Sequence, residues 1–457
     1  MRITHVTFGA FKSLYDVECD FSPFTVITGP NGAGKSNLAD GINFIAAAYR
    51  NGLEMAVAGA GGYDSIAHRR TSRARTPISI GLELELGPHD VEQYFRLPRQ
   101  STRRTRTSKR GISYPLSFRH RFSFRARGQA LASEFSVEQE TMEVADAAGT
   151  LLRISRLTKD DESGFAILLD DRIRKLDEHS ERLFYPVVDE QFQRIQRRPL
   201  ANTDLLFTSL SIYGGLFSLI RRELHGSVFQ LSPQQARKPG APTPNASLQR
   251  YGENLPAVVH FLRKHRAEAW ARIEDAMRVV VPNLVEIETR HTEDRFLALQ
   301  FRERGVRRAW STSEMSDGAI QALALFTAVL DGRSGFLLIE EPENSLHPWV
   351  LRRFLDLCRD ESESQIVLTT HSPVAIDYTP ADSLRLMWQR HGRSSYQNWT
   401  TLNPEIVEAW KRGDVRAFEA YDSGLFHEAV PPGFLAVDED QMSSGDDGWM
   451  NKEADRS

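Results

Sequence analysis

The chain is poor in cysteine and has no long apolar run. Only two of its 457 residues are cysteines, and Cys19 and Cys358 lie far apart in sequence, in no metal-ligand spacing. This argues against cysteine ligands and predicts a reducing compartment. No stretch approaches the ~20 apolar residues that a membrane helix needs, and residues 1–5 lack the apolar core of a signal peptide. We therefore expect a cytoplasmic protein with no membrane partner.

The bulk composition is that of a globular protein. Hydrophobic residues make up 40% of the chain and charged residues 26%, in the range of soluble domains. The length allows roughly two to three domain-sized units. The net charge of −4 is small, but the basic residues are unevenly distributed along the chain.

The most specific motif lies at residues 29–37, which fit the P-loop pattern G-x-x-x-x-G-K-S/T. In such a loop the glycines let backbone N–H groups point at phosphate oxygens, and the lysine supplies charge for the β- and γ-phosphates. The serine hydroxyl is a hard oxygen ligand for Mg²⁺. An apolar run at residues 24–28 predicts a strand before the loop, and helical spacing from residue 35 to 49 predicts a helix after it. The residues expected to bind ATP here are Gly29, Pro30, Asn31, Gly32, Ala33, Gly34, Lys35, Ser36 and Asn37.

A second group of motifs lies near the other end of the chain. Residues 336–339 form a buried-strand pattern that ends at Glu340 and Glu341. Two acids at the carboxyl end of a strand resemble a Walker B segment, in which the first holds Mg²⁺ and the second polarises the attacking water. Residues 365–369 predict another buried strand. His371, directly after it, is well placed to sense the γ-phosphate.

Between these motifs, residues 313–319 form a loop of mostly small and polar residues. Apolar residues then recur at helical spacing from Ile320 to Val329. A small-residue loop at a helix N-terminus is an anion site, and its place shortly before the acidic strand strengthens that interpretation.

Together these motifs resemble an ABC-type ATPase of the RecF/SMC-like group, within the AAA family ATPases of bacteria. The resemblance covers residues 1–50 and 310–380. It rests on the opening turn at 8–13, the Walker B and D-loop at 340–348, the signature loop at 315–318 and Thr-His-Ser-Pro at 370–373. It implies an α/β fold, an ABC-type ATPase head with a P-loop sheet and a flanking antiparallel β-subdomain, plus a short helical lobe.

We expect four parts in the chain. Residues 1–170 would form the first half of the head and 171–290 a helical lobe inserted into it. Residues 291–435 would form the second half, with the signature loop, Walker B and switch histidine. Residues 436–457 read as a disordered acidic tail. No long heptad arm or Cys-x-x-Cys hook is present, which excludes a zinc-hook repair ATPase or a full SMC arm.

The resemblance implies a homodimer in which two protomers sandwich two ATP molecules, and it leaves a higher oligomer open. Ser316 and Gly318 would contact the γ-phosphate bound to the partner protomer. The residues implied in catalysis are Glu341 as general base, His371 as γ-phosphate sensor and Lys35 as phosphate ligand. Ser36 and Glu340 would hold the metal, Lys12 would lie near the nucleotide, and Asn344 and Ser345 would lie in the dimer interface.

The sequence departs from the family pattern at three places. Ala319 stands where a polar residue is usual, and Glu340 stands where most relatives have aspartate. No clear Q-loop glutamine is recognised, and His68 is the nearest candidate by position.

A strongly basic segment lies in the first half of the chain. From Gln93 to Ser133 there is no acid. Such clustering is the electrostatic footprint of a phosphate backbone, so we expect DNA binding through residues 96–127. A solvated loop, or one that docks an acidic protein, is the alternative. The basic residues are Arg96, Arg99, Arg103, Arg104, Arg106, Lys109, Arg110, Arg119, Arg121, Arg125 and Arg127, with a second basic loop at Arg69, Arg70, Arg73 and Arg75.

Alternation at residues 77–86 and 115–126 predicts strands of the antiparallel sheet. In the second of these, Phe118, Phe122 and Phe124 would face the core, with the intervening arginines outward.

Three functions are compatible with these features. The first is an ATPase that dimerises on ATP and acts on DNA as the sensor or scaffold of a phage-defence system, beside a separate nuclease or toxin. The second is a RecF-like DNA repair ATPase. The third is an ATP-gated protein-assembly module without nucleic acid, in which the arginine segment binds an acidic protein.

Overall fold

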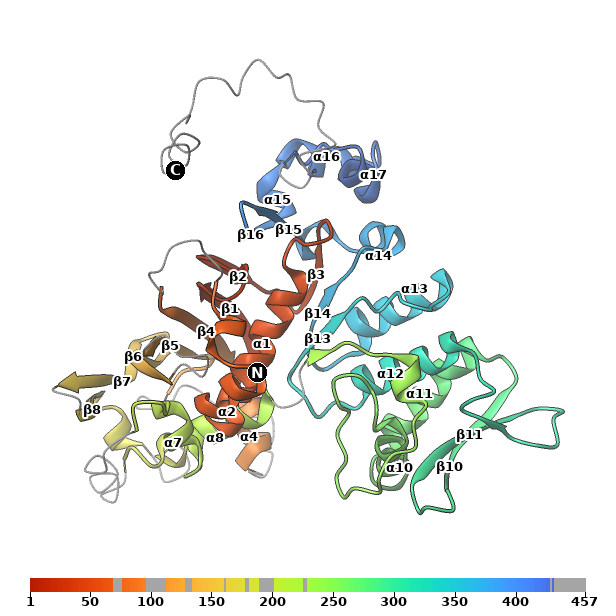
Figure 1. The fold of residues 1–457 in the computed structure, drawn as a ribbon, viewed down its shortest axis with the longest axis horizontal. Coiled ribbons are helices and arrows are strands. Elements are labelled where there is room, and N and C mark those ends of the chain that lie inside the picture. Colours follow the sequence, from red (N-terminus) through yellow and green to blue (C-terminus); the bar gives the residue numbers. More distant parts are fainter. Residues whose placement is uncertain are drawn as a thin grey trace, which may run out of the picture.

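The structure is a computed structural model that describes residues 1–68, 76–95, 112–127, 134–159, 162–176, 181–188, 201–224, 228–427 and 430. Two large sheets lie on either side of helix α1 (Lys35–Asn51) (Figure 1). One is antiparallel and the other is mainly parallel. Among the described residues, no helix is both long and apolar enough to cross a membrane.

The mainly parallel sheet carries the P-loop. Its strand order is β16-β15-β3-β14-β13-β9, and only the β15–β16 pair is antiparallel. Each residue of β3, β13 and β14 is buried, which explains why these strands are rich in apolar and β-branched residues. The strands are β3 (Phe24–Thr28), β9 (Val228–Phe229), β13 (Phe336–Glu340), β14 (Gln365–Thr369), β15 (Leu384–Arg390) and β16 (Arg393–Asn398).

The flanking sheet has the order β2-β1-β4-β5-β6-β7-β8, and every neighbouring pair is antiparallel. Phe118, Phe122 and Phe124 on β5 are buried, as predicted. The strands are β1 (Arg2–Gly9), β2 (Val17–Asp20), β4 (Ile78–Leu86), β5 (Leu116–Arg127), β6 (Glu134–Asp146), β7 (Gly149–Lys159) and β8 (Glu162–Leu169). The expected α/β class, with a P-loop sheet and an antiparallel β-subdomain, is therefore confirmed.

Helix α1 contacts the antiparallel sheet through a buried polar network. The Tyr49 hydroxyl lies 2.6 Å from His120 Nδ1, and His120 Nε2 lies 3.2 Å from Glu140 Oε1. Glu140 also accepts the backbone N–H groups of Leu206 and Phe207 at the start of α7 (Leu206–Ser211). Because Tyr49, His120 and Glu140 pair with one another away from water, the network fixes α1, the sheet and α7 in one arrangement.

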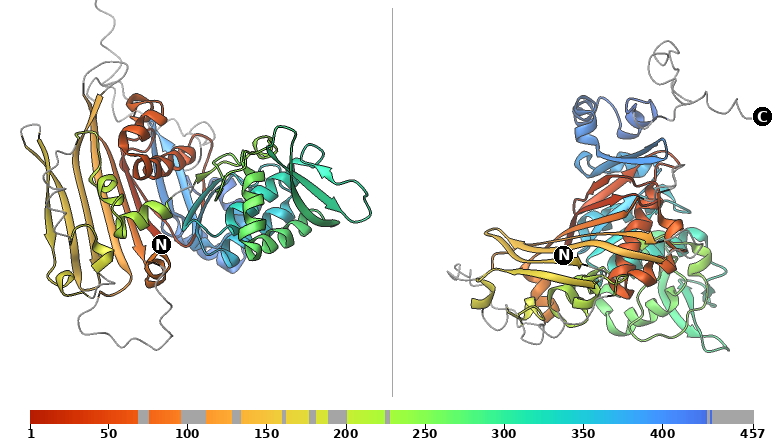
Figure 2. Two further views of the ribbon diagram at one scale, coloured as in Figure 1. Left: turned by 90° about the horizontal axis from the view of Figure 1, so that it is seen from below. Right: turned by 60° about the vertical axis from the view of Figure 1, so that its left-hand side comes forward.

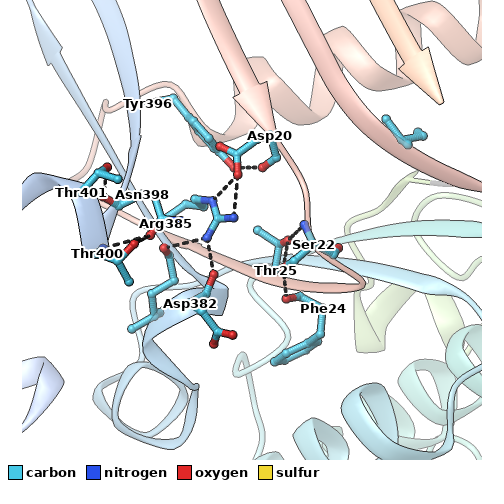
Figure 3. A network of polar contacts seen from close by, with 12 residues as sticks. Asp20, Ser22, Phe24, Thr25, Asp382, Arg385, Tyr396, Asn398, Thr400 and Thr401 are labelled. Atoms are coloured by element: carbon cyan, nitrogen blue, oxygen red, sulfur yellow. Dashed lines mark hydrogen bonds and ion pairs between the residues drawn. The ribbon is translucent and has the colours of Figure 1, made fainter. Parts of the chain in front are cut away.

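A second connection joins the two sheets directly. The buried Arg385 on β15 donates to Asp20 Oδ2 on β2 from Nε at 3.1 Å and from Nη2 at 2.7 Å (Figure 3). The Tyr396 hydroxyl donates to the Asp20 carbonyl at 2.6 Å. A two-pronged guanidinium contact of this kind fixes orientation as well as distance.

The remaining elements divide between two hydrophobic clusters. Helices α7 and α8 pack with α1 and the antiparallel sheet, whereas α10 to α12 pack on the other side of the parallel sheet (Figure 2). The segment 171–290 thus contributes to both clusters, and its boundaries as a lobe stay a prediction. The small third sheet is β10 (Leu284–His291), β11 (Leu297–Glu303) and β12 (Trp310–Ser311).

The other helices are α2 (Leu53–Gly59), α3 (Tyr63–Ile66), α4 (Pro88–Phe95), α8 (Gly215–Glu223), α9 (Pro233–Ala236), α10 (Leu255–His265), α11 (Ala267–Val280), α12 (Asp317–Leu330), α13 (Pro348–Asp356), α14 (Pro373–Tyr378), α15 (Trp399–Leu402), α16 (Pro404–Arg412) and α17 (Ala417–Asp422).

Candidate functional site

The candidate site lies at the carboxyl edge of the parallel sheet. Strands β9, β13, β14 and β3 are parallel neighbours, so the residues that follow them meet at one edge. The register places Glu340 of β13 opposite Thr369 of β14, and Thr369 opposite Ile27 of β3. The P-loop, both Walker B acids and His371 are brought together in this way.

The P-loop glycines are required by close contacts. A Cβ on Gly29 would lie 2.0 Å from the Met387 carbonyl oxygen, and one on Gly34 would lie 2.1 Å from Ser394 Oγ. Gly34 also has a φ of +104°, which strains any other residue. Helix α1 begins directly after it, so the free N–H groups of its first turn face the loop.

Lys35 folds back over the P-loop. Its Nζ donates to the carbonyl oxygens of Gly29 at 2.8 Å and Pro30 at 3.2 Å. Burial lowers the pKa of Lys35 to about 8, and Glu341 and Glu343 act in the opposite direction. The Lys35 ammonium is therefore held beside the loop and next to two carboxylates. When a nucleotide binds, oxygens of its terminal phosphates would replace the backbone carbonyls as hydrogen-bond acceptors of the ammonium.

Of the other P-loop residues, Asn37 donates from Nδ2 to Ser13 Oγ at 2.6 Å. Ala33 is buried, while Asn31 and Ser36 are exposed.

Ser36 and Glu340, the two residues predicted to hold a metal, are neighbours in the site. The Ser36 hydroxyl hydrogen-bonds to the buried Glu340 carboxylate, and the Glu340 side chain is only 3% exposed. Burial raises the pKa of Glu340, although hydrogen bonds from Ser36 and Arg250 act against the rise. A hydroxyl and a carboxylate are hard oxygen donors, so this pair suits Mg²⁺ with water and phosphate oxygens completing its shell.

Glu341 follows in a strained turn with a φ of +45°, and its N–H donates to the Thr369 carbonyl at 2.8 Å. Its Oε2 accepts a hydrogen bond of 3.1 Å from the Asn344 side chain. A left-handed conformation at a residue other than glycine costs free energy and is often kept at functional positions. The turn directs the second acid away from the strand on which Glu340 lies.

His371 is half-buried in the same site. Burial lowers its pKa, Lys35 lowers it further, and Glu341 partly opposes this. The imidazole is therefore neutral at pH 7 and has one N–H to donate. Lys35, Glu341 and His371, predicted from separate motifs, thus interact within one site.

Glu343 is a member of the site that sequence reasoning missed. Its Oε1 accepts the Thr370 hydroxyl and the His371 backbone N–H, both at 2.8 Å, while its buried Oε2 has no hydrogen-bond partner among the residues that the structure describes. It therefore fixes the turn that carries the switch histidine. The signal was available, since a third acid follows Glu341 within two residues.

A second missed residue is Gln230, which directly follows β9. Phe229 pairs with Ile339 of β13, so Gln230 extends the register to the level of Glu340. His68, in contrast, hydrogen-bonds through Nδ1 to the Lys12 carbonyl oxygen at 2.6 Å and lies beside the Tyr15 ring. Gln230 is therefore a second candidate beside His68, and the Q-loop residue stays a prediction. Strand β9 has only two residues, too few to show a periodicity.

The signature loop contacts the D-loop within one protomer. Ser316 caps α12 by accepting the Ala319 N–H at 3.2 Å. A Cβ on Gly318 would lie 2.7 Å from the Ser345 carbonyl oxygen, so only glycine allows this approach. Arg237 holds the loop from the other side, donating to the carbonyls of Thr312 at 3.0 Å and Met315 at 2.7 Å and forming an ion pair with Asp317.

We predict that Gly318→Ala separates these two loops. Because the added Cβ meets backbone, the loop must shift, and a displacement of about 1 Å costs on the order of 100-fold in turnover. ATP binding to the P-loop should persist, because the contact that the added Cβ disturbs lies between the signature loop and the D-loop. Steady-state ATPase assays check this against Gly59→Ala, whose Cβ would meet none of the described residues within 4 Å. Wild-type turnover in Gly318→Ala would contradict the predicted contact.

Comparison with known proteins decides the family. The sequence model of the family described as "AAA domain, putative AbiEii toxin, Type IV TA system" matches residues 24–377, from the P-loop strand to beyond His371. The chain belongs to this AAA-domain family. The predicted resemblance to AAA family ATPases is thereby confirmed. No curated protein matches the sequence.

Several solved structures resemble this AAA-domain protein at low identity. An SMC head bound to the C-winged helix domain of ScpA has 15% identity and a TM-score of 0.47, covering 87% of this chain and 98% of its own. An SMC head domain from Thermotoga maritima has 13% identity and a TM-score of 0.38, covering 87% and 99%. One from Pyrococcus furiosus, bound to the C-terminal domain of ScpA, has 15% and 0.41, covering 90% and 99%. These TM-scores are too low to support the assignment, which rests on the family match and the site geometry.

Proposed function

We propose that the protein binds and hydrolyses ATP with Mg²⁺ and that it dimerises on ATP. The observation that carries this proposal is the convergence of Lys35, Ser36, Glu340, Glu341 and His371 at one sheet edge. In such a dimer each ATP would contact the P-loop of one protomer and Ser316 and Gly318 of the other.

Each residue has a defined role in this mechanism. Lys35 and the P-loop N–H groups would bind the phosphates, and Ser36 and Glu340 would hold Mg²⁺, which would supply positive charge to neutralise the phosphates. The Glu341 carboxylate orients the attacking water and accepts its proton, and neutral His371 donates its N–H toward the γ-phosphate. Little covalent chemistry is asked of the protein, so positioning accounts for most of the rate.

We further propose that the protein is cytoplasmic and acts on DNA as the sensor or scaffold of a phage-defence system with a separate nuclease or toxin. The arginine-rich sequence supports the DNA contact, and the family description, which names a toxin and a toxin–antitoxin system, supports the toxin partner. Residues 96–111 lie outside the described residues, as do Arg69, Arg70, Arg73, Arg75 and the tail from residue 436.

Three arginines of β5 already have acidic partners, Arg121 and Arg125 at exposed positions and Arg119 at a partly exposed one. Arg119 and Arg121 contact Glu83 at 2.6 and 3.1 Å, and Arg125 contacts Glu138 at 3.0 Å. Exposed pairs of this kind contribute about 0–1 kcal/mol, so a phosphate backbone can compete for these side chains at little cost. We accordingly assign the DNA contact to the whole segment 96–127, with the arginines of β5 able to take part in it.

The test reverses charge in that segment. Changing Arg103, Arg104 and Arg106 to Glu should abolish DNA binding in a filter-binding titration while ATP binding survives. The matched control reverses Arg304, Arg307 and Arg308, three exposed arginines between β11 and β12. Unchanged DNA affinity in the first variant would refute the assignment.

ATP turnover discriminates the alternatives. Stimulation by DNA favours the defence ATPase or the RecF-like repair ATPase, and a toxin that co-purifies separates the first from the second. Stimulation by a protein alone favours the assembly module.

A further inference from the structure

Arg250 lies at the metal end of the site, although no motif includes it. Its Nη2 donates to Glu340 Oε1 at 3.1 Å and to Asp40 Oδ1 at 2.9 Å. Asp40 is on α1, and its Oδ2 accepts from Lys12 Nζ at 2.6 Å. Charges of alternating sign thus run from Lys12 through Asp40 and Arg250 to Glu340.

The arginine is held there by its own backbone. The Gln230 N–H donates to the Arg250 carbonyl at 2.9 Å, and the Ser232 N–H donates to the Tyr251 carbonyl at 3.2 Å. The residues that follow β9 are therefore tied to residues 250–251. This places the guanidinium on the side of Glu340 where β9 pairs with β13.

Glu340 needs such a partner because it is almost fully buried. Its side chain is 3% exposed, against 24% for Arg250 and 30% for Asp40. A buried carboxylate is stable only when it is paired and hydrogen-bonded. Ser36 and Arg250 are the side chains that the structure shows to serve it.

Asp40 is in turn suited to hold the arginine. Burial acts to raise its pKa, but hydrogen bonds from Lys12 and Arg250 outweigh burial and keep the pKa below its ordinary value. Asp40 is therefore an anion at neutral pH, and it accepts on both oxygens. Asp40, on α1, therefore holds the Arg250 guanidinium in contact with Glu340, on β13.

This arrangement also accounts for the departure from the family pattern at residue 340. An aspartate would be shorter by one methylene. The glutamate places one carboxylate within reach of both the Ser36 hydroxyl and the Arg250 guanidinium.

We propose that Arg250, anchored by Asp40, is a positioning residue for the metal-binding carboxylate of Glu340. The assignment rests on the proposed ATPase function. Arg250 would act on hydrolysis through Glu340, as outer-shell partners orient the ligands of other metal sites. Lys12 belongs to the same series of charged contacts through Asp40, so its role is to support the site.

The test measures ATP affinity twice, in EDTA and in Mg²⁺, by titration with a fluorescent ATP analogue. Arg250→Gln should leave the affinity in EDTA unchanged, because the P-loop contacts of Lys35 do not involve Arg250. The gain in affinity on adding Mg²⁺ should fall by about 10- to 100-fold, as for other outer-shell partners. The Mg²⁺ concentration for half-maximal turnover should rise in parallel, and Asp40→Asn should shift both readouts in the same direction.

Arg302→Gln is the matched control. Arg302 also contacts two glutamates, Glu286 and Glu288, but in the small sheet away from the parallel-sheet edge. A second comparison uses Glu340→Asp, alone and with Arg250→Gln. If Arg250 acts through Glu340, the double variant should lose no more of the magnesium gain than the worse single variant.

Three results would overturn the assignment. One is an unchanged magnesium gain in Arg250→Gln. Another is an equal loss of affinity in EDTA and Mg²⁺, which would indicate a general disturbance of the site. Additive losses in the double variant would show that Arg250 does not act through Glu340. A wild-type protein that binds no ATP in either condition would overturn the proposed function as well, a result distinct from these three.

Discussion

Lys35→Ala is expected to lose ATP binding by roughly 30- to 3,000-fold. Losing one partner of a buried charge pair costs about 2–5 kcal/mol, and each ~1.4 kcal/mol is tenfold in affinity. Lys35 is the buried cation of the P-loop, and its Nζ reaches the carbonyls at the start of the loop. Titration with a fluorescent ATP analogue measures the loss. Tight ATP binding by the variant would overturn the P-loop assignment.

Stability separates this loss from unfolding. In the nucleotide-free protein the pKa of Lys35 is lowered to about 8, from an ordinary value of 10.5, chiefly by burial. The folded state therefore binds fewer protons than the unfolded state between these values, and this group makes stability rise with pH in that window. Below it the buried charge is a cost, so Lys35→Ala should melt no lower than wild type at pH 7. Lys411→Ala, at an exposed lysine, is the control for both measurements.

Glu341→Gln is expected to keep ATP and to stop turnover. A general base contributes about 10²- to 10⁴-fold to the rate, and the amide cannot accept the proton from water. The amide oxygen can still accept the Asn344 side chain, so the turn after β13 should persist. Single-turnover assays measure the rate, and light scattering in ATP and Mg²⁺ should show an accumulated dimer. Glu408→Gln, at an exposed acid on α16, is the matched control.

A third acid in the same turn, Glu343, allows the experiment to distinguish between two candidates for the general base. Glu343 accepts two hydrogen bonds at one oxygen, and a glutamine would keep them. Glu343→Gln should therefore slow turnover less than Glu341→Gln. The reverse order, with near-normal turnover in Glu341→Gln, would move the general base to Glu343.

The sequence predicted the parts of the site where local geometry restricts the residue type. A Cβ on Gly29 would lie 2.0 Å from the Met387 carbonyl oxygen and one on Gly34 2.1 Å from Ser394 Oγ, so both positions require glycine, and the strand β13, which is buried along its whole length, is rich in apolar residues. These requirements restrict the residue type at positions that are neighbours in the sequence, so the motifs can be recognised without a structure. The paired acids and His371 are likewise fixed by the strands that they follow.

The parts of the site that could not be predicted from the sequence depend on contacts between distant segments of the chain. Arg250 meets residues 210 and 90 positions away in the chain, and Arg237 meets the signature loop across 75 or more. Neither arginine belongs to a periodic pattern or a turn that demands its type. Their contacts become visible only once the path of the chain between β9 and α10 is known. That path could not be predicted from the sequence, because the two residues of β9 are too few to form a recognisable strand pattern.

Helix α1 has the P-loop at one end and the Tyr49–His120–Glu140 network near the other. The antiparallel sheet that it contacts is continuous in sequence with the arginine-rich segment, which lies between α4 and β5. If a ligand of that segment moves the sheet, α1 moves with it, and the affinity for ATP changes by some factor. Thermodynamic reciprocity then requires ATP to change the affinity for that ligand by the same factor. If each ligand is titrated in the absence and in the presence of the other, the two ratios of affinities must therefore be equal. That ratio measures how strongly the two binding sites are coupled.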